Sequence, residues 1–224
     1  MFKAVLFDLD NTLMDFMSMK RISCEAAIGA MIDAGLDMGH DKAYNKLFEL
    51  YGKYGIEHQE IFQEFLMEVR GEIDYKILSS GVTAYRRVQA GFMRPYPHVR
   101  ATLIALRERG VKLGILSDAP RMRAWLRLSE MSLTDFFDTV ITLDDTGEMK
   151  PSPKAFGAAA KGLGVEAGKI LFVGDNPERD IKGARDAGMK TALAKYGQIF
   201  PDGKAKADYE LKDVQDLLGI VGKK

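Results

Sequence analysis

This chain of 224 residues has one cysteine and no excess of charge of either sign. It also lacks long hydrophobic runs. The single cysteine, Cys24, excludes an intrachain disulfide and a multi-cysteine metal site, and we expect it to be a small buried residue. Lysine plus arginine number 32, as do aspartate plus glutamate, so the net charge is 0. Proteins that bind nucleic acid or anionic membranes usually carry a basic excess or basic clusters. We therefore expect neither as the main partner.

Long apolar segments are missing as well. No run approaches the roughly 20 residues of a membrane-spanning helix. The stretch at residues 1–7 is too short for a signal peptide and ends at Asp8. The composition, 46% hydrophobic and 29% charged, is typical of a folded soluble protein. These features predict a cytoplasmic protein with one large core, or a core with an insert, and a solvated tail at residues 223–224.

Short apolar runs that end in acidic, hydroxyl or glycine residues predict the strands of a parallel sheet. Such runs suit strands that are buried on both faces and are too short for long helices. Helices are expected between them, since Ser152-Pro153 and Asn176-Pro177 each combine an N-cap side chain with proline at the first helical position. Strands alternating with helices predict an α/β fold. The expected strands are residues 3–8, 111–116 and 170–173, and more weakly 139–142, 191–194 and 209–211.

The connection between the first two expected strands is much longer than a crossover needs. Residues 99–109 suffice for that crossover, which makes residues 14–94 surplus. They are amphipathic rather than loop-like and predict a small all-helical domain inserted after the first strand. A core of residues 1–13 and 95–224 then surrounds it, joined through a linker at 91–97. The expected insert helices are residues 18–34, 41–54, 58–70 and 73–89.

Residues that can carry chemistry follow the expected strands. Ligands bind outside the carboxyl ends of the strands in open α/β sheets. Asp8 and Asp10 end the first strand and suit a nucleophile beside a general acid/base, a cation site, or acids that cap a turn. Ser117-Asp118 follows the second strand and either holds a phosphate or caps a helix. Lys150 either neutralises an anion or is solvated.

A further pair of acids follows the third clear strand. Asp175 comes directly after Gly174, and Asp180 lies about one helical turn further along. The position of Asp180 also suits simple stabilisation of a helix N-terminus. Arg179 and Arg185 are expected to pair with neighbouring acids on the helix surface.

These residues form four motifs, which are Asp8 with Asp10, Ser117, Lys150, and Asp175 with Asp180. With the motifs in this order, the chain resembles the haloacid dehalogenase superfamily of hydrolases over nearly its whole length. The family pattern is Asp-x-Asp-x-Thr, then Ser or Thr, then Lys, then Gly-Asp with a second acid. One subfamily carries a helical cap domain where this chain has its insert. The resemblance implies a Rossmann-like core in which the first and fourth motif strands are adjacent, bringing Asp8 beside Asp175.

The resemblance also implies roles for individual residues. Asp8 is expected to attack phosphorus and form an aspartyl-phosphate, while Asp10 protonates the leaving group and then activates water. Mg²⁺ is expected on Asp8, the Asp10 backbone carbonyl and Asp175. Thr12 and Asp180 are expected to support the site. The residues expected at the phosphate are Asn11, Ser117, Asp118 and Lys150.

The implied function is Mg²⁺-dependent hydrolysis of a small phosphorylated metabolite, of the sugar or triose phosphate class. Three alternatives stay open: a phosphomutase, a 2-haloacid dehalogenase and a catalytically silent binding module. The dehalogenase branch lacks the second acid of the first motif, so Asp10 favours a phosphatase. Asp118 stands where many relatives have asparagine, and we expect it to face a helix N-terminus or a substrate hydroxyl. The chain is expected to be a monomer or a homodimer.

Overall fold

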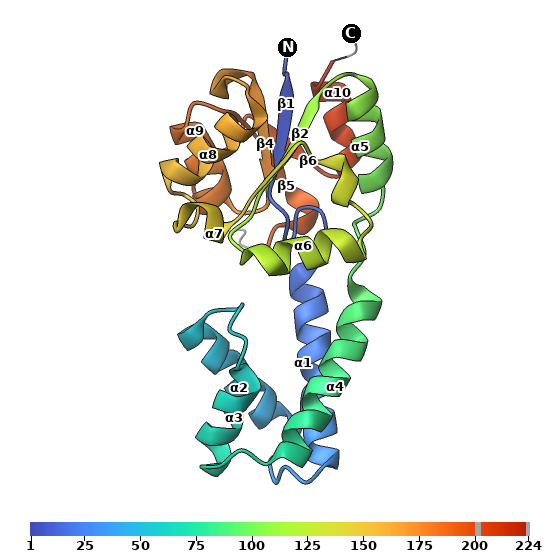
Figure 1. Ribbon diagram of the computed structural model, residues 1–224, viewed down its shortest axis with the longest axis vertical. Helices are drawn as coiled ribbons and strands as arrows, with labels where there is room; N and C mark the ends of the chain where they lie inside the picture. Colours follow the sequence, from blue (N-terminus) through green and yellow to red (C-terminus); the bar gives the residue numbers. More distant parts are fainter. Residues whose placement is uncertain (200–202, 223–224) are drawn as a thin grey trace. The chain divides into compact units, whose positions relative to one another are not determined.

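The computed structural model describes residues 1–199 and 203–222, so the tail at 223–224 lies outside it. The chain divides into two compact units (Figure 1). One consists of Met1–Phe16 and Arg94–Lys224, and is called the core below; the other, Met17–Met93, is called the insert.

Within the described residues, the core is built on a six-stranded parallel sheet of order β3-β2-β1-β4-β5-β6. This is the strand order of a Rossmann-like fold, whose ligand crevice lies where the order reverses. The reversal falls between β1 and β4, which pair in register with Phe7 opposite Val173. The α/β prediction is therefore confirmed. The strands are β1 Ala4–Phe7, β2 Lys112–Leu116, β3 Thr139–Ile141, β4 Ile170–Gly174, β5 Lys190–Ala194 and β6 Tyr209–Leu211.

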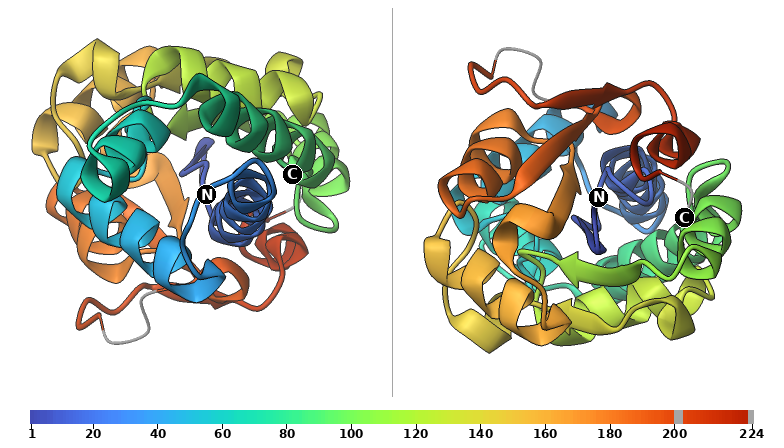
Figure 2. Two further views of the ribbon diagram at one scale, coloured as in Figure 1. Left: turned by 90° about the horizontal axis from the view of Figure 1, so that it is seen from below. Right: turned by 90° about the horizontal axis from the view of Figure 1, so that it is seen from above.

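Helices cover both faces of this sheet, with α8 and α9 on one side and α5 and α10 on the other (Figures 1 and 2). On the α8 side, the rings of Phe156 and Phe172 meet edge to face with their centroids 5.3 Å apart. Both side chains are completely buried, so this contact anchors α8 to β4. The core helices are α5 Val99–Glu108, α6 Arg121–Glu130, α7 Leu143–Thr146, α8 Pro153–Leu163, α9 Lys182–Asp186 and α10 Leu217–Ile220.

The two expected helix starts are present, but the second helix differs from the expectation. Ser152 caps α8 by accepting a hydrogen bond from the Lys154 amide. Asn176 caps the segment η3, Pro177–Ile181, which is a wide π-helical turn that precedes α9. The expectation of one regular helix is wrong there, because the amide of Ile181 reaches back five residues to the Asn176 carbonyl.

The insert consists of α1 Phe16–Asp33, α2 His40–Tyr54, α3 Ile61–Arg70 and α4 Tyr75–Phe92. Its apolar core includes Cys24, which is buried as predicted. Helix α4 packs closely on α1 at Gly81, where an added Cβ would overlap the Met31 side chain. Helix α4 also runs on to Phe92, so the expected linker begins later than residue 91.

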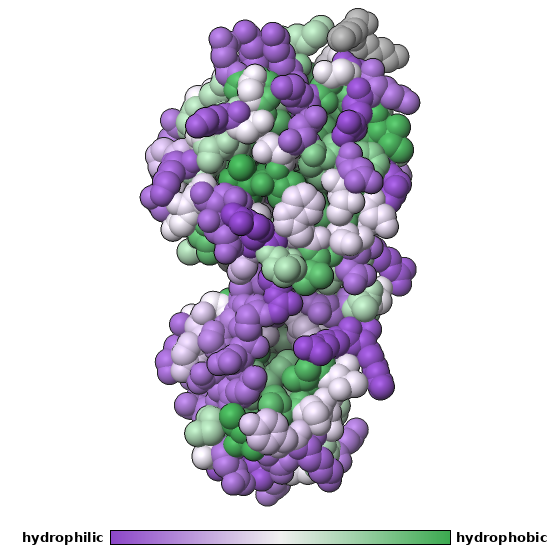
Figure 3. All heavy atoms as spheres, viewed as in Figure 1, coloured by the Kyte–Doolittle hydropathy of each residue, from purple (hydrophilic) through white to green (hydrophobic). Residues whose placement is uncertain are grey.

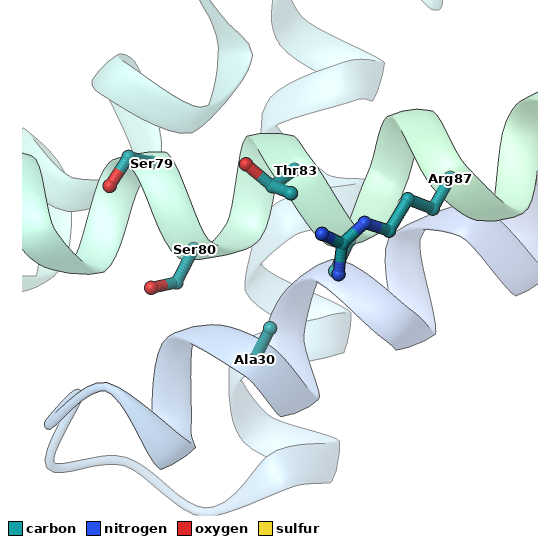
Figure 4. A pocket seen from close by; sticks show the side chains of 6 residues that line it. Ala30, Ser79, Ser80, Thr83 and Arg87 are labelled. Carbon is teal, nitrogen blue, oxygen red and sulfur yellow. The ribbon is translucent and has the colours of Figure 1, made fainter.

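The outer surface is predominantly hydrophilic on the face shown in Figure 3. In the part of the chain that the structure describes, no helix is long and apolar enough to cross a bilayer. A shallow hollow in the insert lies between α1 and α4 (Figure 4). Ser79 and Ser80 line it, but both hydroxyls donate to the Lys76 carbonyl of their own helix. The candidate catalytic residues lie elsewhere, in the core.

Candidate active site

The strand register brings the sequence-predicted residues to one edge of the core sheet. Asp8 directly follows β1, Ser117 follows β2 and Asp175 follows β4. These strands are neighbours in the sheet, so the three residues leave it side by side. Lys150 reaches the same place from the segment before α8. All four residues are buried, which places them in a region where charge interactions are strong.

Lys150 forms the positive centre of the site. Its Nζ lies 2.5 Å from Asp8 Oδ1 and 2.8 Å from Asp180 Oδ1. Burial by itself lowers the pKa of an ammonium group, but the Asp180 and Asp8 carboxylates outweigh this effect and raise the pKa of Lys150. Lys150 is therefore a permanent cation, and the possibility that it is a solvated surface lysine is excluded by its 1% side-chain exposure.

Three acids share this space with a single lysine. One oxygen from each of Asp8, Asp175 and Asp180 lies within 4.8 Å of the others. Burial and neighbouring carboxylates raise the pKa of Asp8 to about 7, despite the ion pair with Lys150. Burial, Asp8 and Asp180 raise the pKa of Asp175 to about 8. The cause of both shifts is an excess of buried negative charge.

The acid cluster has the properties of a site for a hard divalent cation. Among the described residues, neither carboxylate oxygen of Asp175 has a hydrogen-bond partner, although both are buried. A buried carboxylate without partners is costly, and a cation bound to these oxygens removes that cost. Oxygen ligands of this kind suit Mg²⁺. The donor set therefore fits the metal that the sequence led us to expect.

Asp180 enters the cluster because two local features allow it to turn back toward β4. Its Oδ2 accepts a hydrogen bond from the Asn176 amide at 3.0 Å, within the wide turn of η3. An added Cβ at Gly174 would lie 2.5 Å from the same oxygen. Gly174 is thus required for this close approach, and it is the glycine that precedes Asp175 in the fourth motif.

The loop after β1 is held by Tyr196 and Gly197, which were not among the predicted site residues. Thr12 Oγ1 donates to Asp8 Oδ2 at 3.5 Å, and Asn11, with a positive φ of 58°, is buried in the same loop. The Tyr196 hydroxyl donates to the Thr12 carbonyl at 2.9 Å. Gly197 packs so tightly against Asn11 that any Cβ there would overlap the Asn11 carbonyl oxygen. The only sequence signal was the pair Tyr196-Gly197 after β5. Its contact with the loop after β1 cannot be inferred without knowing the strand order.

Asp10 is not one of the three clustered acids, although its charge contributes to the raised pKa of Asp8. Its Oδ2 accepts a hydrogen bond from Arg127 Nη1 at 2.6 Å. Arg127 belongs to α6 and is buried, although it was not among the predicted site residues. A signal did exist, since Ala124 and Leu128 are the buried apolar residues of α6 and Arg127 shares their helical face.

Asp118 corrects two expectations. Its Oδ1 accepts a hydrogen bond from the Lys150 amide at 2.8 Å, and its Oδ2 lies 3.2 Å from Arg179 Nη1. The alternative in which Asp118 caps the following helix is wrong, because α6 begins at Arg121 and its N-cap residue, Pro120, provides no side-chain cap. Arg179 was expected to pair along its own helix, and instead it reaches across to Asp118. Ser117 Oγ accepts a hydrogen bond from the Ala119 amide at 3.1 Å, which fixes its hydroxyl beside the cluster.

We expect Asp118→Asn to leave the substrate preference unchanged. An asparagine oxygen still accepts from the Lys150 amide, while the half-exposed ion pair with Arg179 contributes at most about 1 kcal/mol to folding. Asp118→Ala, which removes that acceptor, is expected to lower kcat roughly 10-fold by loosening the Lys150 backbone. The ratio of kcat/KM for two substrates measures the substrate preference, steady-state kinetics give kcat, and urea unfolding gives the stability. A changed ratio in Asp118→Asn would place this residue in substrate selection.

Taken together, the sheet order and the buried lysine among carboxylates define a Rossmann-like enzyme with a carboxylate as its candidate nucleophile. The chain belongs to the haloacid dehalogenase-like hydrolases, whose family model matches residues 2–188. The resemblance drawn from the motifs is thereby confirmed.

Relatives and solved structures agree with this assignment. The chain is 34% identical to a glyceraldehyde 3-phosphate phosphatase of Methanocaldococcus jannaschii, over 99% of this chain and 97% of that protein. It is 37% identical to the protein of the same name from Pyrococcus abyssi, over 99% and 94%. The crystal structure of a phosphatase of this family from Thermococcus onnurineus superposes with a TM-score of 0.74 at 29% identity, covering 100% of this chain and 99% of that one. The chain is therefore an enzyme, a hydrolase of the phosphatase type.

Proposed function

We propose that the protein is a cytoplasmic, Mg²⁺-dependent phosphatase that hydrolyses a sugar or triose phosphate through an aspartyl-phosphate at Asp8. The observation that carries this proposal is the buried Asp8–Lys150 ion pair beside the Asp175 and Asp180 carboxylates. The names of two relatives, glyceraldehyde 3-phosphate phosphatases, support the triose phosphate class. The insert, residues 14–94 in our assignment, is proposed to act as the cap that selects the substrate.

The proposed chemistry proceeds in two displacements. In the first, an oxygen of Asp8 forms a bond to phosphorus, the bond from phosphorus to the leaving oxygen breaks, and Asp10 gives its proton to that oxygen. In the second, a water oxygen bonds to phosphorus, the bond to Asp8 breaks, and Asp10 takes the proton from water. Lys150 and Ser117 bind the phosphoryl oxygens, Asn11 lies beside them, and Asp118 holds the Lys150 backbone in place.

Asp8, Asp175 and the Asp10 backbone carbonyl are proposed to hold Mg²⁺, with Asp180 in support. The bound ion supplies positive charge that offsets the repulsion between the Asp8 carboxylate and a phosphate dianion. The remaining stabilisation comes from residues of the chain. Lys150 neutralises the charge that develops on the transferring phosphoryl group, and burial of the site strengthens that attraction.

Removal of the metal is expected to abolish most of the activity. With excess EDTA, release of phosphate from p-nitrophenyl phosphate should fall roughly 10³-fold, and Mg²⁺ should restore it. Mg²⁺ should also raise the Tm of the resting enzyme, because it binds the folded acid cluster and not the unfolded chain. Asp175→Asn should abolish that rise, whereas Glu130→Gln, at an exposed acid on α6, should keep it. Full activity in EDTA, or a Tm rise that survives in Asp175→Asn, would contradict the metal assignment.

A panel of phosphorylated metabolites tests the rest of the proposal. Free phosphate should be the product, with a triose or sugar phosphate among the best substrates. An isomerised phosphorylated product would indicate the phosphomutase alternative, and halide release from a 2-haloacid would indicate the dehalogenase. No turnover above that of the Asp8→Asn variant would indicate a silent binding module.

A further inference from the structure

Arg127 is a buried cation that the proposed chemistry has not yet used. Its side chain is 6% exposed, and its Nη1 lies 2.6 Å from Asp10 Oδ2. The guanidinium group of Arg127 also lies over the Phe16 ring, 4.4 Å from the ring centroid. Burial of an arginine carries a substantial desolvation cost, which pairing with a carboxylate and stacking on a ring both reduce.

The neighbours of Arg127 on α6 show that this environment is specific to it. Arg121 is exposed and pairs with Asp145 at the surface. Arg123, one helical turn before Arg127, is only partly buried. Arg127 alone of the three arginines in this described helix points at a residue of the first motif. The helix thus places one guanidinium against the carboxylate to which we assign proton transfer.

We propose that Arg127 is a positioning residue for Asp10. This inference rests on the proposed function, in which Asp10 exchanges a proton with the leaving group and with water. Arg127 fixes Oδ2, so that the proton is exchanged at Oδ1, and Phe16 limits the directions in which the guanidinium can lie. The charge of Arg127 also offsets part of the repulsion that the Asp10 carboxylate exerts on Asp8.

Leaving-group dependence separates positioning of Asp10 from general structural support. An alkoxide leaving group needs a proton, whereas p-nitrophenolate leaves readily without one. Rapid-quench measurement of phosphoenzyme formation with glyceraldehyde 3-phosphate should therefore show a roughly 10²-fold loss in Arg127→Ala. With p-nitrophenyl phosphate, the same step should change by no more than about 3-fold. Arg123→Ala is the matched control and should leave both rates unchanged.

A double-mutant cycle gives a second readout. If Arg127 acts through Asp10, Arg127→Ala should lower the rate of an Asp10→Asn enzyme by less than about 3-fold further. Arg127→Lys, which keeps the charge but not the planar geometry, should recover part of the glyceraldehyde 3-phosphate rate. If Arg127→Ala does not fold, Arg127→Lys and Phe16→Leu provide the same comparison, with a smaller loss confined to the alkyl phosphate.

Equal losses with both leaving groups, or losses that multiply fully with that of Asp10→Asn, would overturn the proposal and leave Arg127 with a structural role. Failure of the proposed function looks different. In that case Asp10→Asn itself would retain the wild-type rates, or would lose the same factor with both substrates, whatever residue stands at position 127.

Discussion

Asp8→Asn should lower kcat for phosphate release by roughly 10⁴-fold or more, because no other group in the site can replace the carboxylate that attacks phosphorus. The amide is nearly isosteric with the carboxylate but is a poor nucleophile. Lys150 would still lie beside it and keep the local packing. The loss should therefore appear in kcat, with a folded protein of normal secondary structure.

Two measurements check this expectation. Steady-state turnover of p-nitrophenyl phosphate gives kcat, and thermal shifts with beryllium or aluminium fluoride report whether the site traps phosphoryl mimics. Wild type should be stabilised by these complexes and Asp8→Asn should not. Asp37→Asn, at an exposed acid of the insert, is the control and should behave as wild type. Normal turnover in Asp8→Asn would remove Asp8 from its proposed role.

Lys150→Met has the second largest expected effect, and it combines activity with stability. Removing one partner of a buried ion pair typically costs 3–5 kcal/mol, so we expect the unfolding free energy in EDTA to fall by about 3 kcal/mol or more. The kcat should fall roughly 10³-fold, since the transferring phosphoryl group loses its fixed cation. Lys154→Met is the matched control, because Lys154 is 60% exposed and its pair with Glu148 is solvated.

The stability loss in Lys150→Met should also depend on pH. The pKa of Asp8 is already raised to about 7 with Lys150 present, and without that lysine it can only rise further. A carboxyl with a raised pKa binds its proton more tightly in the folded state than in the unfolded state. Stability is then lost as pH rises from about 4 through the folded pKa. Urea unfolding in EDTA should show a larger loss at pH 8 than at pH 5; a loss that is equal at both would contradict the buried-charge account.

The parts of the fold that depend on local pattern were predictable. The strand Ala4–Phe7 is completely buried, so its residues are all apolar and its end is marked by Asp8. The helix starts at Ser152 and Asn176 rest on interactions within three residues and are found where expected. The adjacency of β1 and β4 is different, because spacing along the chain does not determine strand order. It followed from the family resemblance.

The parts that depend on distant partners were missed or mistaken. Asp118 pairs with Arg179 and the Lys150 amide, which lie far along the chain, so its orientation had no local signal. The wide turn of η3, within which Asp180 accepts a hydrogen bond from the Asn176 amide, is not encoded by a pattern of apolar residues. Arg127 could have been found, since it lies on the buried face of α6, but its partner Asp10 could not.

The central claim is a covalent phosphoryl group on Asp8, and rapid-quench mass spectrometry tests it most directly. The enzyme is mixed with substrate and Mg²⁺, stopped in acid within one turnover, digested and analysed by peptide mapping. We predict that the peptide containing Asp8 gains the mass of one phosphoryl group, and that hydroxylamine removes it. A phosphoryl group on another residue, or turnover in H₂¹⁸O that incorporates no label into phosphate, would contradict the account.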